Sequence, residues 1–497
     1  MRKKMMAMAA VTAMMVSAGT GSVAMAAQEN DDPSKWPVVK MEVVSSTGEE
    51  AKEQEIEDAL NKYLVSIDAG VQADLVPLAF GDRATQLTLL LTDSENGIDL
   101  FCWRFYSSVT DMVNNDQVIA LDDYRDQYPE LWELFPESVY KTCQVNGKQY
   151  SMPAADSFGN FQVYTMRKDI AEEIGVMDLV GKKITEEQFE DILAKAEAAH
   201  PELCWLTDPT VTSYQEIDNL GFSDWIGVLL NQGIDQDTIV NYYETDEYKE
   251  FVETMYDWQQ KGYLSKDAAT TTESAENQVK AGAAFSYLAP NKPGYDTRAA
   301  LLCGTEMEIA PISEPWAGTA QISYLTYGIS SSSADKDKTM QCLDYLYGNA
   351  DILNLLNWGE EGVDYEVVDA ENNIINYPDG KDDSNTYHLA EGWQLFDQFK
   401  MHIWEGDSPD IWDETKALNE SAIKSKAFGF TYDSTSVANE LAALSNVKAK
   451  YAAALGSGTV DPEETLPKFI EELKKAGIEK VISTKQEQLD KWLEENK

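Results

Sequence analysis

The chain has 497 residues, of which 43% are hydrophobic and 10% aromatic, enough apolar side chains for large buried cores. Its 87 acidic residues outnumber its 39 lysines and arginines, and the formal net charge of −48 argues against binding to nucleic acid or to an anionic membrane. The sequence therefore describes an acidic globular protein of two or three lobes and excludes a disordered chain.

The first predicted element is a secretory leader. Three cations at positions 2–4 precede an apolar run over residues 5–16, and an Ala-x-Ala site ends at Ala26. An apolar core too short to span a bilayer, between a basic start and such a site, is typical of a signal peptide, here residues 1–26. We expect an exported chain whose net charge changes from −48 to −51 when the leader is removed. No later segment is apolar enough for a membrane helix.

Alternating strand and helix patterns follow the leader. Strands are predicted at 37–44, 73–80 and 98–103, because these runs are apolar and rich in β-branched residues. Helices are predicted between them, over 49–67 and around Leu87 and Leu91. A β-α-β-α-β run favours a parallel sheet, and ligands of such sheets meet the carboxyl ends of the strands.

The middle of the chain predicts a second lobe. A strand at 161–166 follows a glycine-containing loop, and a helix begins at Thr185, where Gln188 completes a capping box. Further helices at 247–261 and 273–280 precede extended segments at 282–287 and 309–312. A strand at 323–329 and a helix around Met340 and Leu343 predict the return to the first lobe.

Two aromatic segments near the end of the chain read as helices. Trp393, Phe396, Phe399 and Trp404 have spacing that favours one helix, in which the tryptophans would be mostly core. Trp492 with Leu489 and Leu493 predicts an apolar face on which the last helix docks.

Few residues suit catalysis or metal binding. The three histidines are scattered, and His200 precedes a proline at a predicted helix end. No nucleophile elbow, phosphate loop, dinucleotide fingerprint or zinc spacing occurs, and the aspartates at 379, 382 and 383 lack the order of an EF-hand. We expect no catalytic residues, no cofactor and no metal site.

The five cysteines are few and irregularly spaced. They predict neither a disulfide framework nor a zinc site, and most should be small buried apolar residues. The first of them is Cys102. A cysteine that carries a lipid stands directly after the leader, so we expect no lipid anchor of that kind.

Several motifs in a fixed order resemble one family. They are GIDLFCW (97–103), IALDDYRDQYPEL (119–131), NGKQYSMPAADSFGNFQVYTMRKDI (146–170), LNWGEEGVDYEV (355–367), SKAFGFTYD (425–433) and the tail from 466 to 496. Together they resemble the extracellular solute-binding proteins, family 1 type, that deliver carbohydrates to ABC importers, in the LipO-like branch with its characteristic C-terminal region. The missing cysteine after the leader departs from the Gram-positive members of that family.

The resemblance implies an α/β, two-lobed periplasmic-binding-protein-like fold of type II, with lobes joined by hinge crossovers and ligand held between them. It implies lobe 1 at 27–157, lobe 2 at 158–311, a return to lobe 1 with the hinge at 312–385, and a C-terminal helical region at 386–497 packed on lobe 2 and the hinge. The implied partners are a carbohydrate, expected to be an oligosaccharide, and the membrane subunits of a permease, with the binding protein itself a monomer.

Sugar sites combine aromatic faces with planar polar groups, so we searched strand ends and crossovers for both. Trp103, Asp156 and Trp358 are the first candidates for ligand binding. The secondary candidates are Asp82, Arg83, Tyr106, Trp225, Tyr287 and Trp316. Each could instead pack in a core, cap a turn or pair with a neighbouring charge.

Two other functions stay open. Because glycosidases need only two carboxylates at a suitable separation, 87 acidic residues leave a secreted carbohydrate-cleaving enzyme possible. A carbohydrate-binding protein without a transporter would lack hinge closure. The expected location is outside the cell or at its surface, or the periplasm in a Gram-negative bacterium.

Overall fold

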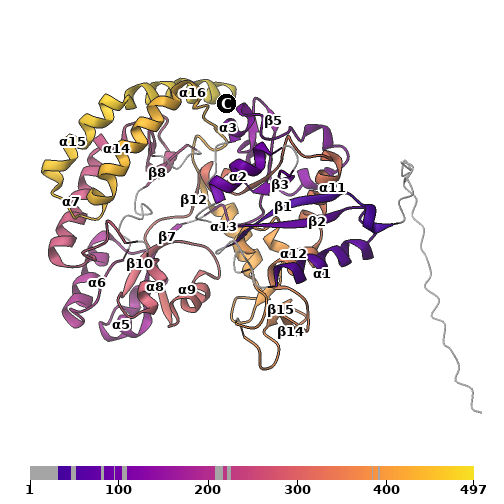
Figure 1. Cartoon of the computed structure of the whole chain (residues 1–497). Coiled ribbons are helices and arrows are strands. Elements are labelled where there is room, and N and C mark those ends of the chain that lie inside the picture. Colours follow the sequence, from indigo (N-terminus) through magenta and orange to yellow (C-terminus); the bar gives the residue numbers. More distant parts are fainter. Residues whose placement is uncertain are drawn as a thin grey trace, which may run out of the picture.

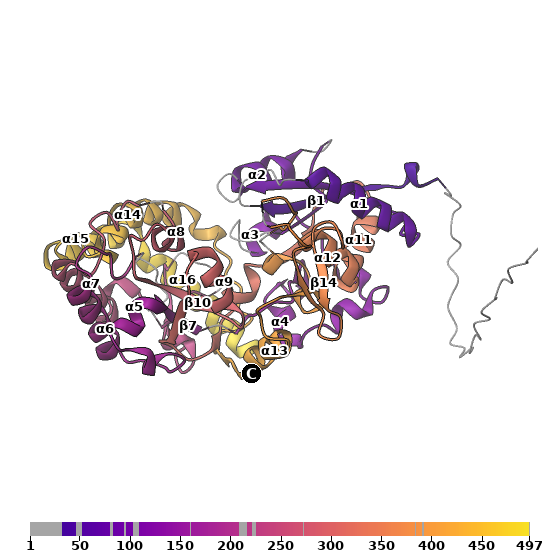
Figure 2. The same cartoon turned by 90° about the horizontal axis from the view of Figure 1, so that it is seen from below.

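The structure is a computed structural model that describes residues 32–45, 52–79, 83–93, 96–102, 109–159, 161–207, 216–220, 225–271, 273–382, 384–389 and 392–496. The predicted leader lies outside these residues. The described chain folds into two lobes (Figure 1 and Figure 2). The indigo N-terminal and orange segments form lobe 1, and the magenta middle segments and yellow C-terminal helices form lobe 2.

Lobe 1 is built on a five-stranded sheet of order β2-β1-β3-β13-β6. Its first elements confirm the predicted alternation: β1 (Val38–Ser45), α1 (Glu53–Ser66), β2 (Gln72–Ala79), α2 (Arg83–Thr92) and β3 (Leu100–Cys102). β1 pairs in parallel with both β2 and β3. Ile56, Leu60 and Leu64 form the buried face of α1, as their spacing predicts.

The rest of the sheet is joined by antiparallel pairing through β13. β13 (Thr326–Ile329) returns from lobe 2 and pairs with β3 and with β6 (Met152–Pro153). The covering helices α11 (Lys336–Gly348) and α12 (Ala350–Trp358) bury Met340, Leu343 and Leu353 in the same core. Shorter elements of this lobe are α3 (Val109–Asn114), the 3₁₀ turn Pro129–Trp132, α4 (Glu137–Lys141), β4 (Gln144–Val145) and β5 (Lys148–Gln149).

Lobe 2 has a three-stranded antiparallel sheet of order β10-β7-β11. Its elements are β7 (Phe161–Arg167), α5 (Lys168–Glu173), α6 (Glu186–Ala199), β8 (Ile217–Asp218), β9 (Leu229–Leu230), α7 (Asp246–Lys261), α8 (Ala275–Lys280), β10 (Ser286–Asn291), α9 (Tyr295–Cys303) and β11 (Met307–Pro311). The capping box of Thr185 and Gln188 is present at the start of α6. Phe189 packs edge-on against both Tyr164 and Trp258 in the core of this lobe.

Three long helices end the chain and cover the outer side of lobe 2 (Figure 1). They are α14 (Ala438–Gly456), α15 (Pro462–Ala476) and α16 (Ile478–Glu495). Their apolar faces share a core with α7 and with residues 217–220 and 225–243, in which Phe469 and Leu489 are fully buried. Leu489, Trp492 and Leu493 dock α16 onto this core, as predicted.

The predicted helix through Trp393 and Trp404 is wrong. That segment forms two 3₁₀ turns, Gly392–Gln394 and Gln398–Lys400, and then the short strand β16 (Ile403–Trp404). β16 pairs with β15 (Ile374–Asn376), which pairs with β14 (Glu366–Asp369), and the loop continues into α13 (Ile411–Ser421). The aromatic residues have helical spacing, but their rings pack against several different elements and do not form one face of a helix.

Candidate functional site

The carboxyl ends of β1, β2 and β3 define the edge of lobe 1 at which a ligand is expected. The loops after these strands, 46–51, 80–82 and 103–108, lie outside the described residues. Three predicted ligand residues, Trp103, Asp82 and Tyr106, fall in them. The described part of this edge is formed by the start of α1 and by the loop after α12.

An ion pair brings the loop after α12 to this edge. Lys52 directly precedes α1, which follows the loop after β1, and its Nζ donates to Oδ1 of Asp364 at 2.7 Å. The same carboxylate accepts the backbone N–H groups of Glu360 and Tyr387, at 3.0 and 2.9 Å. Burial disfavours the charged carboxylate, but the Lys52 ammonium and the two backbone donors outweigh it and lower the pKa of Asp364.

Three stacked rings stand beside that loop. Trp358, the last residue of α12, stacks on His388 with 4.3 Å between ring centroids and on Trp404 with 5.2 Å. The rings of His388 and Trp404 are almost parallel, at 2°. Trp358 is 9% exposed, whereas His388 and Trp404 are half-buried and keep part of their surface open. We call Trp358, His388 and Trp404 the ring platform.

The hinge lies beside another polar cluster, centred on Asp156. Asp156 lies in the crossover, the segment that leads from β6 of lobe 1 to β7 of lobe 2. Its Oδ1 accepts from Nζ of Lys292 at 2.7 Å. Because Lys292 follows β10, this ion pair links lobe 2 to the crossover. Lys292 also donates to Oε1 of Gln398, at 3.2 Å. Asn419 of α13 holds the crossover from the other side, donating to the carbonyl of Asp156 and accepting from the N–H groups of Phe158 and Gly159.

The two lobes also approach each other next to the ring platform. Gly294 precedes α9 of lobe 2 with φ of 79°, and a Cβ there would lie 2.6 Å from the Ile411 side chain at the start of α13. Asp407, three residues after Trp404, is half-buried nearby. Burial raises the pKa of its carboxyl, against a hydrogen bond from Thr297 of α9. The platform therefore belongs to lobe 1 but lies next to lobe 2.

Comparisons with known proteins agree with this geometry. The chain is 25% identical, over 96% of its length and 94% of the relative, to a carbohydrate ABC transporter substrate-binding protein of Streptococcus pneumoniae. Its structure matches the N-glycan transport solute binding protein NgtS of the same species with a TM-score of 0.82 and 23% identity, covering 93% of this chain and all of that one. NgtS in complex with Man1GlcNAc matches with a TM-score of 0.77 at 23% identity, covering 92% of this chain and all of that one. Residues 426–494 match the family described as Domain of unknown function (DUF3502).

The chain has the two-lobed fold of ABC-transporter solute-binding proteins. This confirms the resemblance and the α/β fold class inferred from the sequence. The lobe boundaries predicted from it stay a prediction. Within the region 386–497 that was expected on lobe 2 and the hinge, Tyr387, Phe396 and Met401 pack in the core of lobe 1.

Within this solute-binding fold, the remaining predicted ligand residues lie away from the platform. Arg83 is 4% exposed and forms an ion pair with Glu42 of β1, which is fully buried. Burial raises the pKa of Glu42, and the Arg83 guanidinium partly offsets that effect. Arg83 thus pairs with the buried carboxylate of Glu42. This contact does not support the predicted role of Arg83 in ligand binding.

Three aromatic candidates have packing contacts. Tyr287 is 1% exposed in β10, where its hydroxyl accepts from that of Tyr295. Trp225 packs edge-on against Tyr242 in the core shared with the C-terminal helices. Trp316 lies in β12 (Trp316–Ala317), which pairs with β17 (Ile423–Lys424) at the hinge. Their ligand roles stay predictions, and among the six candidates that the structure describes Trp358 is the one at the ring platform.

Sequence reasoning missed most of the described site. It assigned Trp404 to a core helix and gave His388 no role, and it did not single out Lys292, Gln398 or Asn419. The only available signal was that Trp358, His388 and Trp404 stand in aromatic-rich segments, which does not show that the segments meet.

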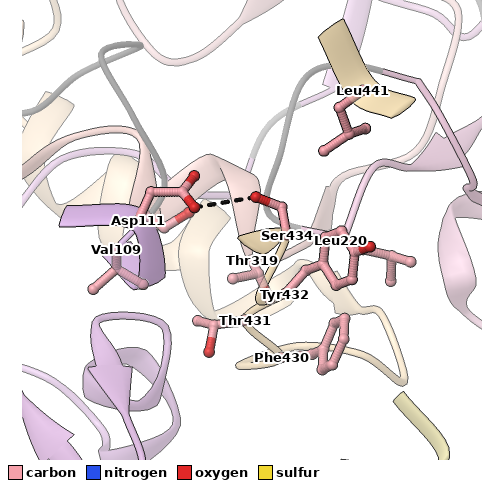
Figure 3. A pocket seen from close by; sticks show the side chains of 10 residues that line it. Val109, Asp111, Leu220, Thr319, Phe430, Thr431, Tyr432, Ser434 and Leu441 are labelled. Atoms are coloured by element: carbon pink, nitrogen blue, oxygen red, sulfur yellow. Dashed lines mark hydrogen bonds between the residues drawn. The ribbon is translucent and has the colours of Figure 1, made fainter. Parts of the chain in front are cut away.

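A small cavity between the lobes is a separate feature (Figure 3). α3 of lobe 1 contributes Val109 and Asp111, and the segment before α14 contributes Phe430 to Tyr432 and Ser434. Its volume of about 20 Å³ is sufficient for one water molecule and too small for a sugar ring. The ring platform is therefore the better candidate for the sugar-binding surface.

Metal chemistry and membrane insertion find no support in the described ranges. No group of three or more His, Cys, Asp or Glu side chains there could hold a metal ion. Asp383 of the acidic loop lies outside them. Among the helices that the structure describes, none is long and apolar enough to span a bilayer. All five cysteines are free thiols.

Proposed function

We propose that this protein is the extracellular binding component of an ABC importer, and that it captures an oligosaccharide between its lobes. The observation that carries this proposal is the similarity to a carbohydrate ABC transporter substrate-binding protein over 96% of the chain, in a fold of two lobes. The neighbour NgtS is named for N-glycan transport and has been crystallised with Man1GlcNAc, which makes a glycan of several sugars the first ligand to test.

The ring platform supplies the apolar half of a sugar site. A sugar ring presents C–H groups on one face and hydroxyls at its edge, so it binds best against an aromatic face bordered by polar groups. His388 and Trp404 offer partly open rings. Along the chain, Glu360 and Glu361 lie two and three residues after Trp358, and Glu405 directly follows Trp404. These carboxylates would accept hydroxyl hydrogen bonds.

Lobe closure would make the binding productive. A ligand that contacts both lobes binds the closed arrangement more tightly than the open one. This difference in affinity shifts the equilibrium between open and closed lobes toward the closed arrangement. Lys292 and α9 stand on the lobe 2 side, and the platform on the lobe 1 side.

No covalent step is needed for this function. The protein would act as a monomer outside the cell, after removal of the predicted leader, and hand its ligand unaltered to the membrane subunits of a permease. A secreted glycosidase remains the competing function, because carboxylates are abundant. It differs in one observable, the release of shortened sugars.

The test uses the mature chain and a panel of defined oligosaccharides, including Man5GlcNAc, short fructans and malto-oligosaccharides. A true ligand at 100 times its Kd stabilises the fold by about 2.7 kcal/mol and raises the melting temperature. Small-angle scattering should then show a smaller radius of gyration with ligand. Chromatography of the incubated glycan should recover it intact. Shortened products would establish the enzyme instead.

A further inference from the structure

The C-terminal region of unassigned function touches both lobes. Its helices α14 to α16 pack on lobe 2, as described above. The segment before them, residues 425–435, lies between the two lobes and lines the small cavity with Phe430, Thr431, Tyr432 and Ser434 (Figure 3). We call residues 425–435 the strap.

The strap is fixed firmly on lobe 2. Ala427, Phe430 and Tyr432 lie in the core shared by α7 and the C-terminal helices, and each is at most 6% exposed. The backbone of Asp433 exchanges two hydrogen bonds with the side chain of Gln488 on α16, at 2.8 and 2.9 Å. The N–H of Lys426 donates to the carbonyl of Gly233 at 2.9 Å. The strap therefore moves with lobe 2.

Its other side is held to lobe 1 by exposed and partly buried polar contacts. Asn114 at the end of α3 donates to Oγ1 of Thr435 at 2.9 Å and to Oδ1 of Asp433 at 3.3 Å. Ser434 donates to Oδ1 of Asp111 at 3.1 Å (Figure 3). These bonds join side chains more than 300 residues apart and do not belong to either lobe's own core.

An apolar contact reinforces the polar ones. Phe428 of the strap packs with Val139 of α4, and both belong to a small cluster with Ala317 and Ile322 of the return segment. At the far end of the region, Asn496 after α16 accepts from Nζ of Lys141 at 3.1 Å. The C-terminal region thus contacts α3 and α4 of lobe 1, while its helices pack in the core of lobe 2.

We propose that the C-terminal region is an interlobe restraint: the strap limits how far the lobes open without ligand and so sets the affinity for ligand. The proposal rests on the proposed function for its link to binding. α3 follows the loop after β3, at the edge where the ligand is expected, so further opening of the lobes there has to break the contacts of Asn114 and Asp111. If the lobes open further, part of the binding free energy of the ligand is needed to close them again. The apparent affinity for the ligand is then lower.

The test removes the polar contacts between the strap and α3 of lobe 1 without touching either core, while the apolar contact of Phe428 with Val139 and the bond between Lys141 and Asn496 remain. In the double variant Asn114→Ala/Ser434→Ala, all three side-chain bonds between α3 and the strap are lost. We expect a larger radius of gyration without ligand and a Kd for the glycan that rises about 3- to 10-fold, as two or three partly exposed hydrogen bonds would give. The single variant Asn114→Ala, at an exposed position, should show a smaller change in the same direction.

The matched control is Lys450→Ala. Lys450 of α14 makes equally short exposed bonds to Glu472 of α15, at 2.7 and 3.0 Å, but these stay within the C-terminal region. It should leave scattering and affinity unchanged. Unaltered ligand-free scattering in both strap variants, with melting curves that show folded protein, would overturn the restraint. Failure of the wild-type protein to bind any glycan would overturn the proposed function, while the scattering comparison would still decide the restraint.

Discussion

Nζ of Lys292 lies 2.7 Å from Oδ1 of Asp156, so a lysine of lobe 2 and a carboxylate of the crossover form an ion pair at the hinge. The carboxylate is 8% exposed and the lysine 27%. Removing one partner leaves the other charge partly desolvated, which is more costly than losing an exposed pair.

The hinge pair gives the first prediction. Asp156→Asn and Lys292→Met should each lower the free energy of unfolding by about 1–3 kcal/mol, and the double variant should lose little more than either single variant because the two residues act together. Chemical denaturation measures this. The control Lys195→Ala removes an exposed pair with Asp191 on α6 and should cost about 0.3–0.5 kcal/mol. If Asp156 itself holds the ligand, Asp156→Asn will weaken binding far more than Lys292→Met.

The ring platform gives the second prediction. Trp404→Ala removes a half-buried ring from the platform and should weaken glycan binding by about 2 kcal/mol, roughly 30-fold, with a modest loss of stability. Calorimetric titration measures the change. Trp132→Ala removes another half-buried tryptophan of lobe 1, in a 3₁₀ turn that contributes nothing to the platform, and should leave the affinity intact. Equal affinities in the two variants would return Trp404 to a packing role.

A third prediction concerns Arg83. Arg83→Ala leaves Glu42 buried without its cation and should cost about 3–5 kcal/mol of stability. Thermal and denaturant unfolding measure the loss. A variant of normal stability with abolished glycan binding would contradict the structural role and restore the ligand role expected from the sequence.

The pH dependence of stability gives a fourth prediction, through Asp364. Its pKa is lowered in the folded state, so its contribution is complete above the unfolded value of about 3.9 and is lost as the pH falls through the folded value. At pH 7 Asp364→Asn should be about 1–2 kcal/mol less stable than the wild type. That difference should shrink between about pH 5 and pH 3. A difference independent of pH over this range would mean that the carboxylate is not stabilised by Lys52.

Local patterns predicted much of the scaffold. The spacing of Ile56, Leu60 and Leu64 gave α1, and the Thr185 and Gln188 pair gave the start of α6, because caps and amphipathic faces are encoded within a few neighbouring residues. The segment through Trp393 and Trp404 failed because its rings are satisfied by distant elements, and tertiary contacts then override helical spacing.

The site was predicted only in part for the same reason. Trp358 was chosen from its place in a family-like motif, but nothing near it in sequence shows that His388 and Trp404 stack on it. Lys292 meets Asp156 across 136 residues, and Asn114 meets Thr435 across 321. Such contacts depend on how the lobes pack, which a single sequence does not reveal.

The most direct test of the central claim is small-angle scattering of the mature protein with and without a bound oligosaccharide, with the glycan analysed afterwards. The account predicts a saturable decrease in radius of gyration and recovery of the glycan at its original length. An unchanged radius at saturation, or a glycan cut into shorter pieces, would contradict it.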